Sequence, residues 1–265
     1  MRGDGIRLVR CARLVSLAAL AALGISLAVV PAAATGVVAR WAMDETTGTV
    51  MRDSAPPTSE NGSIGPLVTL TGDGFEYPGW RNNVDTTGRL RGSVPASGGV
   101  VQVTDPRAVF DPDPGFTLAV ELKARLTAQG RLPTKASKGA DPSYNVMQKG
   151  RANSSGGFWK LELAGSGSQL GKIRCVVGDG RRSAVAVPAR RVDDGAWHAV
   201  RCELAGGRLT AVVDGTQATV SASALGAIHP SGQWGTSVWI GKKPGSTDPA
   251  DAFAGWLRNA EFSTS

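Results

Sequence analysis

Residues 192–215 read VDDGAWHAVRCELAGGRLTAVVDG, and this stretch decides the fold class. Two segments of alternating apolar and polar residues flank Gly206 and Gly207, a dipeptide that accepts the positive φ angles of a tight hairpin turn. Alternate side chains of a strand point to the same side of the sheet. The apolar set consists of Val200, Cys202, Leu204, Leu209, Ala211 and Val213. The stretch therefore predicts a β-hairpin with one buried face.

Short alternating segments between Gly-rich turns recur along the chain. The clearest one, residues 116–126, alternates apolar side chains with polar ones such as Glu121 and Lys123, as a half-buried strand does. The other expected strands are residues 37–43, 67–70, 100–104, 145–150, 159–163, 173–177, 183–187, 218–221, 238–241 and 253–262. Strands at this spacing, without a convincing helix after residue 34, predict an all-β sandwich of about a dozen strands. Residues 55–99 are expected to be mostly loop.

Three segments carry a family resemblance. Residues 194–215 resemble the D-G-x-W-H-x-V … L-x-x-x-V-D-G signature of laminin G-like domains, which belong to the concanavalin A-like lectin/glucanase superfamily. Residues 41–54 resemble the W-x-x-D-E-x-x-G … D-S opening of the bacterial laminin G-like subgroup, and residues 253–262 resemble its final strand. The resemblance covers nearly the whole chain after residue 34. It implies an antiparallel, concanavalin A-like jelly-roll β-sandwich whose first and last strands lie side by side.

The first 34 residues have the pattern of a cleavable signal peptide. Four arginines lie within residues 1–13, an apolar run spans residues 14–30, and Pro31 is followed by three alanines. A retained membrane anchor is the alternative interpretation, although the apolar run is short for a membrane span. We therefore expect a secreted protein with a single domain at residues 35–265 and no membrane span after cleavage.

The charge of the chain excludes one class of partner. Residues 1–34 contribute +3 to the formal net charge of +7, so the remaining chain has a net charge of +4. No run of Lys or Arg is interleaved with aromatic residues, as nucleic-acid binding would require. We expect no nucleic-acid partner.

Two cysteines remain after residue 34, namely Cys175 and Cys202. In an exported protein an even pair of cysteines is usually a disulfide, and two cysteines allow one connectivity. Each lies on the apolar face of an expected strand, so the sulfur atoms meet if the two strands are neighbours. A metal or redox site would need further ligands or a C-x-x-C spacing, and neither is present.

The sequence lacks the residue patterns of related enzymes. Retaining glucanases of the superfamily carry E-x-D-x-x-E on one strand, and neither Glu121 nor Glu162 has a carboxylate partner at that step. The patterns of related lyases are also missing. We interpret His198 as a structural residue with a ring satisfied by the backbone, and His229, which precedes Pro230, as a solvated turn residue. We expect no catalytic residue.

Calcium is a possible ligand of this domain. Asp44, Glu45, Asp53 and Asp214 have the oxygen ligands that Ca²⁺ prefers, but none belongs to an Asp-x-Asp-x-Asp loop. In relatives that bind calcium near the paired termini, the resemblance implies a carboxylate where this chain has Arg258. We therefore expect no cofactor, with bound Ca²⁺ as the alternative.

Four aromatic residues are candidates for ligand binding. Tyr77, Trp80 and Trp234 lie in expected loops, and Trp239 points outward from an expected strand. Sugar-binding folds of this kind present such rings at one edge or on the concave sheet, because a pyranose face stacks on them. The alternative is that these rings cap the ends of the core.

The resemblance and the missing catalytic patterns together indicate a secreted, non-catalytic, monomeric binding module. Its expected partner is a carbohydrate, a cell-wall polymer or an extracellular protein. One alternative is a polysaccharide hydrolase or lyase of the same superfamily with an unrecognised site. A structural or accessory module with a separately encoded partner is another, because a fold alone does not determine function.

Overall fold

Sixteen strands and two short 3-10 helices form the described part of the chain, residues 36–56, 59–112, 115–135 and 142–264 of a computed structural model. The described residues belong to one compact unit, Ala33–Ser265. The predicted signal peptide at residues 1–34 lies outside the described residues. No helix in the described ranges has both the length and the apolar composition needed to span a bilayer.

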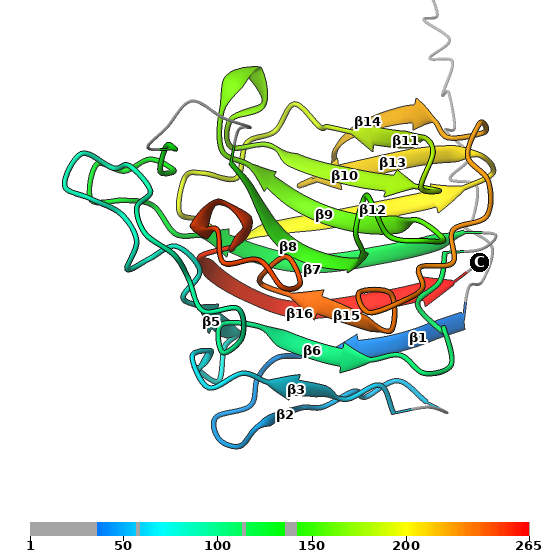
Figure 1. Ribbon diagram of the computed structural model, residues 1–265, viewed down its shortest axis with the longest axis horizontal. Helices are drawn as coiled ribbons and strands as arrows, with labels where there is room; N and C mark the ends of the chain where they lie inside the picture. Colours follow the sequence, from blue (N-terminus) through cyan, green and yellow to red (C-terminus); the bar gives the residue numbers. More distant parts are fainter. Residues whose placement is uncertain (1–35, 57–58, 113–114, 136–141, 265) are drawn as a thin grey trace, which may run out of the picture. The chain divides into compact units, whose positions relative to one another are not determined.

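The strands form two antiparallel sheets, which confirms the predicted jelly-roll β-sandwich (Figure 1). The first sheet has the spatial order β14 (Thr216–Ser221), β13 (Arg208–Val213), β12 (His198–Ala205), β7 (Phe116–Ala124), β16 (Gly255–Thr264), β5 (Phe75–Tyr77) and β4 (Thr69–Leu70). Strand β1 (Gly36–Trp41) also pairs with β16. Because β16 contacts β7 along one edge and both β1 and β5 along the other, the last strand lies inside this sheet.

The second sheet also has eight strands. Its spatial order is β11 (Ser183–Ala186), β10 (Ile173–Gly178), β9 (Phe158–Ala164), β8 (Ser143–Gly150), β15 (Ser237–Ile240), β6 (Val101–Thr104), β3 (Gly62–Ile64) and β2 (Val50–Met51). The 3-10 helices η1 (Gly167–Gln169) and η2 (Pro249–Asp251) lie in the connections.

The predicted hairpin is confirmed as β12 and β13. Val200 pairs with Val213 and Leu204 with Leu209, so their side chains share the buried face. Gly206 and Gly207 have φ angles of 53° and 69°. Two consecutive residues in the left-handed region make the turn whose twist matches that of the flanking strands. The sequence of this turn therefore fixes the register of the hairpin.

The prediction that the first and last strands lie side by side is also confirmed. Gly36 pairs with Thr264 and Trp41 with Ala260. The register between β16 and β7 shifts after Arg258, and Asn259 has a φ angle of 52°. This local irregularity is a β-bulge, in which an extra residue bends the strand.

Aromatic rings from both sheets fill the centre of the core. Phe262 on β16 stacks on Phe116 of β7, with 5.4 Å between the ring centroids. The ring of Trp159, which comes from β9 in the other sheet, lies 5.3 Å from Phe262. Phe110 packs edge-on against Phe262 at 5.2 Å. These contacts join the two sheets through large apolar surfaces, the main source of stability in such a sandwich.

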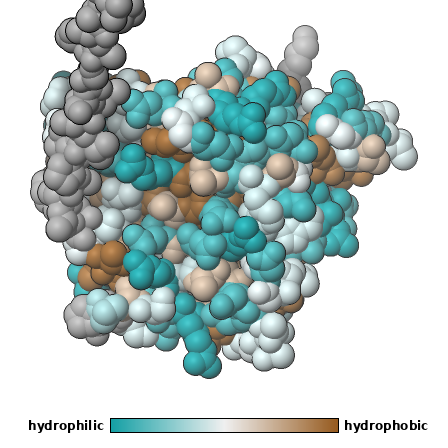
Figure 2. All heavy atoms as spheres, turned by 180° about the vertical axis from the view of Figure 1, so that it is seen from behind, coloured by the Kyte–Doolittle hydropathy of each residue, from teal (hydrophilic) through white to brown (hydrophobic). Residues whose placement is uncertain are grey.

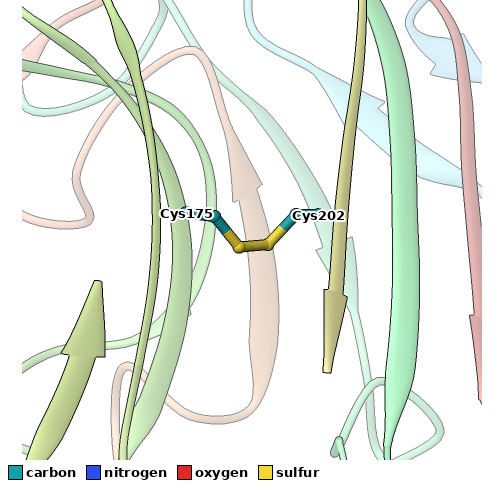
Figure 3. The surroundings of a disulfide bond; sticks show 2 residues. All are labelled: Cys175 and Cys202. Atoms are coloured by element: carbon teal, nitrogen blue, oxygen red, sulfur yellow. A yellow bond between two sulfur atoms is a disulfide. The ribbon is translucent and has the colours of Figure 1, made fainter. Parts of the chain in front are cut away.

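The predicted disulfide between Cys175 and Cys202 is present (Figure 3). Cys175 lies on β10 of the second sheet and Cys202 on β12 of the first, with 5.8 Å between the Cα atoms. The two strands are thus not neighbours in one sheet. The sulfur atoms meet because both cysteines point into the core, where the disulfide links the two sheets.

A buried ion cluster fixes the segment that follows β6. The side chain of Lys149, at the end of β8, is fully buried, and its ammonium group contacts the carboxylates of Asp105 and Asp111. Asp105 also accepts hydrogen bonds from the backbone N–H groups of Val109, at 2.8 Å, and Phe110, at 3.2 Å. The cluster therefore holds the turn that carries the Phe110 ring into the core.

Residues 59–99 contain more strand than the sequence indicated. The expected strand at residues 67–70 is reduced to β4, and the short strands β3 and β5 occur in addition. Strands of two or three residues contain at most one full alternation, so the period-2 pattern cannot reveal them. These short strands account for much of the difference between the sixteen strands described and the dozen expected.

Candidate functional site

Trp239 lies on the outer face of the second sheet. It is the third residue of β15, between Val238 and Ile240, which are both fully buried in the core. Because successive side chains of a strand alternate between the two faces, the indole ring points away from the core. The residue is partly exposed. The prediction that Trp239 faces outward is therefore confirmed.

Polar side chains flank Trp239 in one row across the sheet. Trp239 pairs with Gln102 of β6 on one side and with Gln148 of β8 on the other. Gln148 in turn pairs with Lys160 of β9. Three strand spacings separate the ends of this row, a span of about 14 Å. We call these four residues the indole row.

Trp234 extends the aromatic surface beside the indole row. Its ring packs edge-on against Trp239, with 6.1 Å between the centroids. The guanidinium group of Arg151 lies 5.7 Å from the Trp234 centroid, a cation–π distance. Gly245 packs tightly on the ring, since a Cβ atom at this position would lie 2.5 Å from Cη2 of Trp234. Trp234 is partly exposed and is held in one orientation by these contacts.

Several polar atoms near the indole row have no hydrogen-bond partner among the described residues. They include Nε1 of Trp239, Oε2 of Glu162 and Nε of Arg174. Glu162 is nevertheless flanked by two cations, because it contacts the ammonium group of Lys160 and lies 3.4 Å from the guanidinium group of Arg174. These three atoms are buried, so the group that this face presents to a stacking ligand is the indole ring itself.

The other two candidate rings lie in the core. Tyr77 is fully buried on β5, and Trp80 is 2% exposed, with its ring 6.2 Å from that of Tyr144. Trp80 does lie in a loop, whereas Tyr77 lies on a strand, and neither ring is presented to solvent. Both rings pack in the core, which agrees with the alternative interpretation of these residues. Burial raises the pKa of Tyr77 well above its usual value, with a smaller contribution from the charge of Glu45.

The four candidate calcium ligands are not brought together. Among the described residues, no group of three or more acidic, His or Cys side chains could hold a metal ion. Asp53 instead accepts hydrogen bonds from the backbone N–H groups of Arg40 and Glu60, each at 2.8 Å. Glu45 accepts one from Arg52, Asp44 is exposed, and Asp214 binds a histidine. The described residues therefore do not assemble these four candidates into one ligand set.

His198 is a structural residue, but its partners differ from those expected. The ring is buried at the start of β12, with Nδ1 2.6 Å from Asp214 and Nε2 2.8 Å from Asp194. Two carboxylates from the flanking turns, and not backbone groups, therefore satisfy the ring. Asp214 also accepts a hydrogen bond from the N–H group of Ala199 at 3.0 Å. The arrangement clamps together the turns that begin and end the hairpin.

The clamp at His198 predicts a dependence of stability on pH. Hydrogen bonds from Ala196 and His198 lower the pKa of Asp194. Burial alone would raise the pKa of Asp214, but hydrogen bonds from His198 and Ala199 outweigh it and lower that pKa. A carboxyl group whose pKa is lower in the folded protein than in the unfolded protein stabilises the fold. This stabilisation is fully present above the unfolded pKa of about 3.9 and is lost as the pH falls through the pKa of the folded state.

The substitution His198→Gln should therefore lower the free energy of unfolding by about 2 kcal/mol at pH 7. The difference in the free energy of unfolding between the variant and the wild type should become smaller below about pH 4, where the wild type loses the contribution of the two aspartates. Urea unfolding at pH 7, 5 and 3 measures both quantities. An equal pH dependence of the two proteins would contradict this role of His198.

The outer face of the first sheet has a different character. Trp256 on β16 is partly exposed, and its ring lies under two cations, Lys123 at 5.0 Å and Arg125 at 4.5 Å from the centroid. Arg258 on the same strand lies over the ring of Trp197 at 4.2 Å and pairs with Glu121. Figure 2, seen from behind the view of Figure 1, shows a largely hydrophilic surface with small, separate hydrophobic patches. Trp256 is therefore covered by charged groups, in contrast to Trp239.

Comparison with known proteins shows which domain family this chain resembles. Residues 147–264 match the family model of the laminin G domain. Over these residues the domain resembles a laminin G domain. The match includes Gln148 and Trp239, as well as the hairpin and the closing strand. No curated protein sequence matches the chain.

Several solved structures resemble this chain. The binding domain of botulinum neurotoxin serotype C1 has a TM-score of 0.55 at 12% identity, covering 86% of this chain and 48% of that one. Trypanosoma rangeli sialidase in complex with the inhibitor DANA has a TM-score of 0.50 at 14% identity, covering 88% and 31%. Domains LG4-5 of the mouse laminin alpha1 chain have a TM-score of 0.39 at 16% identity, covering 56% and 34%. The chain thus spans half or less of each of these proteins, and the likeness concerns the fold alone.

Two of the partly exposed rings, Trp234 and Trp239, could be predicted from the sequence, but the side chains around them could not. Gln102 and Gln148 were not singled out, although each lies at an outward position of an expected strand. The alternation along β6 and β8 could have shown their orientation. Their position beside Trp239 depends on strand pairing between distant segments, which no local pattern reveals.

Proposed function

We propose that this laminin G-like domain is a non-catalytic binding module that recognises a carbohydrate or cell-wall polymer on the outer face of its second sheet. The observation that carries the proposal is the indole row, in which the partly exposed Trp239 lies between Gln102 and Gln148. A sugar ring can stack on the indole while the partly exposed side chain of Gln102 binds its hydroxyl groups. Gln148 is 2% exposed and its amide nitrogen donates to the backbone oxygen of Gly150 at 2.6 Å, so it supports the row from below. A protein partner remains the alternative occupant of this face.

The absence of catalysis is part of this proposal. A retaining glycosidase needs two carboxyl groups about 5–5.5 Å apart, one of them protonated to act as the acid. Beside the indole row, Glu162 lies between Lys160 and Arg174. Its side chain is buried, and the two cations contact both of its oxygen atoms, so it is not presented to a ligand on this face. This arrangement supports binding over hydrolysis.

We further propose that the protein is exported. Residues 1–34 have the pattern of a signal peptide, and the core contains a disulfide, a bond that persists in oxidising compartments. Mass spectrometry of the protein released into the medium by its host would locate the mature N-terminus, which we expect near Thr35. Retention of the complete chain in the cytoplasm would contradict this proposal.

The substitution Trp239→Ala tests the binding site. We expect it to weaken binding to polysaccharides or cell-wall fragments by about tenfold to a hundredfold, because loss of a stacked aromatic ring costs roughly 1–3 kcal/mol. Trp256→Ala is the matched control, since it removes the same partly exposed ring from the other sheet. Co-sedimentation with insoluble polymers and calorimetry with soluble oligosaccharides measure the affinities.

The outcomes separate the alternatives. Loss of binding in Trp239→Ala but not in Trp256→Ala supports the indole row as the site. Equal losses, or no effect of either substitution, would overturn it. If no glycan or cell-wall polymer binds to the wild type, the carbohydrate proposal fails and a protein partner becomes the better explanation. Turnover of a labelled polysaccharide would establish an enzyme.

A further inference from the structure

A cavity of about 280 Å³ lies between the loops before β6 and the segment after β15. Its lining includes Leu67, Pro78, Asn82, Asn83, Val94 and Lys242. Small-molecule sites typically have volumes of about 300–1,000 Å³, so the cavity is near the lower end of that range. It is distinct from the indole row, because none of the four residues of that row lines it.

The cavity contains a buried cation without a paired anion. Lys242 is 3% exposed, and its ammonium group donates a hydrogen bond to the backbone oxygen of Pro95. An ammonium group has three N–H donors, and this oxygen is the only acceptor that the described residues provide for it. The nearby carboxylate of Asp251 binds Lys243 at 3.3 Å and the hydroxyl group of Ser246 at 2.7 Å instead.

Burial of this ammonium group is energetically unfavourable. Burial lowers the pKa of Lys242, and the charge of Asp251 opposes that shift. A buried charge costs free energy unless a counter-charge and hydrogen bonds compensate it. An anion in the cavity would supply the counter-charge and would accept hydrogen bonds from the remaining N–H donors of the ammonium group.

The walls of the cavity indicate the kind of anion. The amide nitrogen of Asn83 donates to the backbone oxygens of Arg91, at 3.1 Å, and Ser93, at 2.9 Å, so the side chain is fixed in place. Leu67 is 47% exposed, and it contributes an apolar wall together with Val94. A single cation matches the single charge of a carboxylate, whereas phosphate would bring a second charge without a partner.

From this geometry we infer that the cavity binds a small molecule that carries one carboxylate, with the ammonium group of Lys242 as its counter-ion. The apolar wall contacts the carbon skeleton of the ligand, and the asparagine side chains contact its polar groups. This site does not depend on the proposed function of the indole row.

Calorimetric titration with small carboxylates tests the inference. The probes are acetate, lactate and glucuronate, and glucose serves as the neutral analogue of glucuronate. We expect saturable binding of at least one carboxylate, at least tenfold stronger than that of glucose. Lys242→Met should weaken this binding by about tenfold or more, whereas Lys243→Met, which removes the same charge from the adjacent residue, should change it less than twofold.

Further measurements separate failure of this inference from failure of the polysaccharide proposal and from misfolding of a variant. Trp239→Ala should leave carboxylate binding unchanged, so failure of the polysaccharide proposal is distinguishable from failure of this one. If Lys242→Met does not fold, as judged by thermal unfolding, the wild-type comparison of glucuronate with glucose decides. No carboxylate binding, equal binding of glucose, or equal losses in the two lysine variants would overturn the inference.

Discussion

Replacement of Lys149 by methionine is expected to lower the free energy of unfolding by about 3–5 kcal/mol. The side chain is fully buried, and its ammonium group neutralises the carboxylates of Asp105 and Asp111. Methionine fills a similar volume but removes the cation from the buried carboxylate of Asp105 and from Asp111, which keeps its contact with the ring of His229 at 3.3 Å. Because Asp105 also holds the turn that contains Phe110, the loss should reach the aromatic core. Urea unfolding followed by tryptophan fluorescence measures the change.

A surface ion pair provides the matched control for this prediction. Lys135 lies 3.2 Å from Asp248, and both side chains are partly exposed. Lys135→Met should therefore cost no more than about 1 kcal/mol. Adding Asp105→Asn to Lys149→Met should recover part of the loss, because the substitution removes one of the unpaired charges. Similar losses in the free energy of unfolding for Lys149→Met and Lys135→Met would show that the buried cluster does not cause the loss.

Loss of the disulfide is the second large effect that we expect. Replacing Cys175 and Cys202 together by alanine should lower the free energy of unfolding by about 3–4 kcal/mol, from the loop entropy of a cross-link over 27 residues. For a domain of this size the melting temperature should fall by roughly 7–14 °C. Differential scanning calorimetry under non-reducing conditions measures the shift.

Chemical reduction of the wild type separates the cross-link from the packing of the sulfur atoms. The reduced protein keeps both cysteine side chains but loses the covalent link. Its melting temperature should therefore approach that of the double alanine variant, and the remaining difference reports the packing of the sulfurs. A reduced wild type with an unchanged melting temperature would contradict the entropic stabilisation.

The elements that sequence analysis predicted well have strong local patterns. The hairpin of β12 and β13 carries both the apolar alternation and the Gly206 and Gly207 turn, and its register follows from these alone. The outward orientation of Trp239 follows from its place between two apolar residues of the same strand. Local sequence determines both features, so the pattern was sufficient.

The features that escaped prediction depend on contacts between distant segments. Tyr77 lies on a strand of three residues, and its burial comes from the backbone at Gly241, where a Cβ atom would lie 2.1 Å from the ring. The burial of Lys149 could not be predicted, because its partners lie 38 and 44 residues away. The cavity at Lys242 likewise combines segments from both halves of the chain. No periodicity within one segment encodes such contacts.

The inner position of β16 has a consequence for the order in which the chain can fold. Until β16 has docked, β7 has no partner on one side, and β1 and β5 lack the strand that joins them to the sheet. Strands β7, β12, β13 and β14 can pair without β16, so one half of the first sheet can form before the other half is attached. In that interval the unpaired edge of β7 is exposed to other chains, and docking of β16 removes this opportunity for edge-to-edge aggregation.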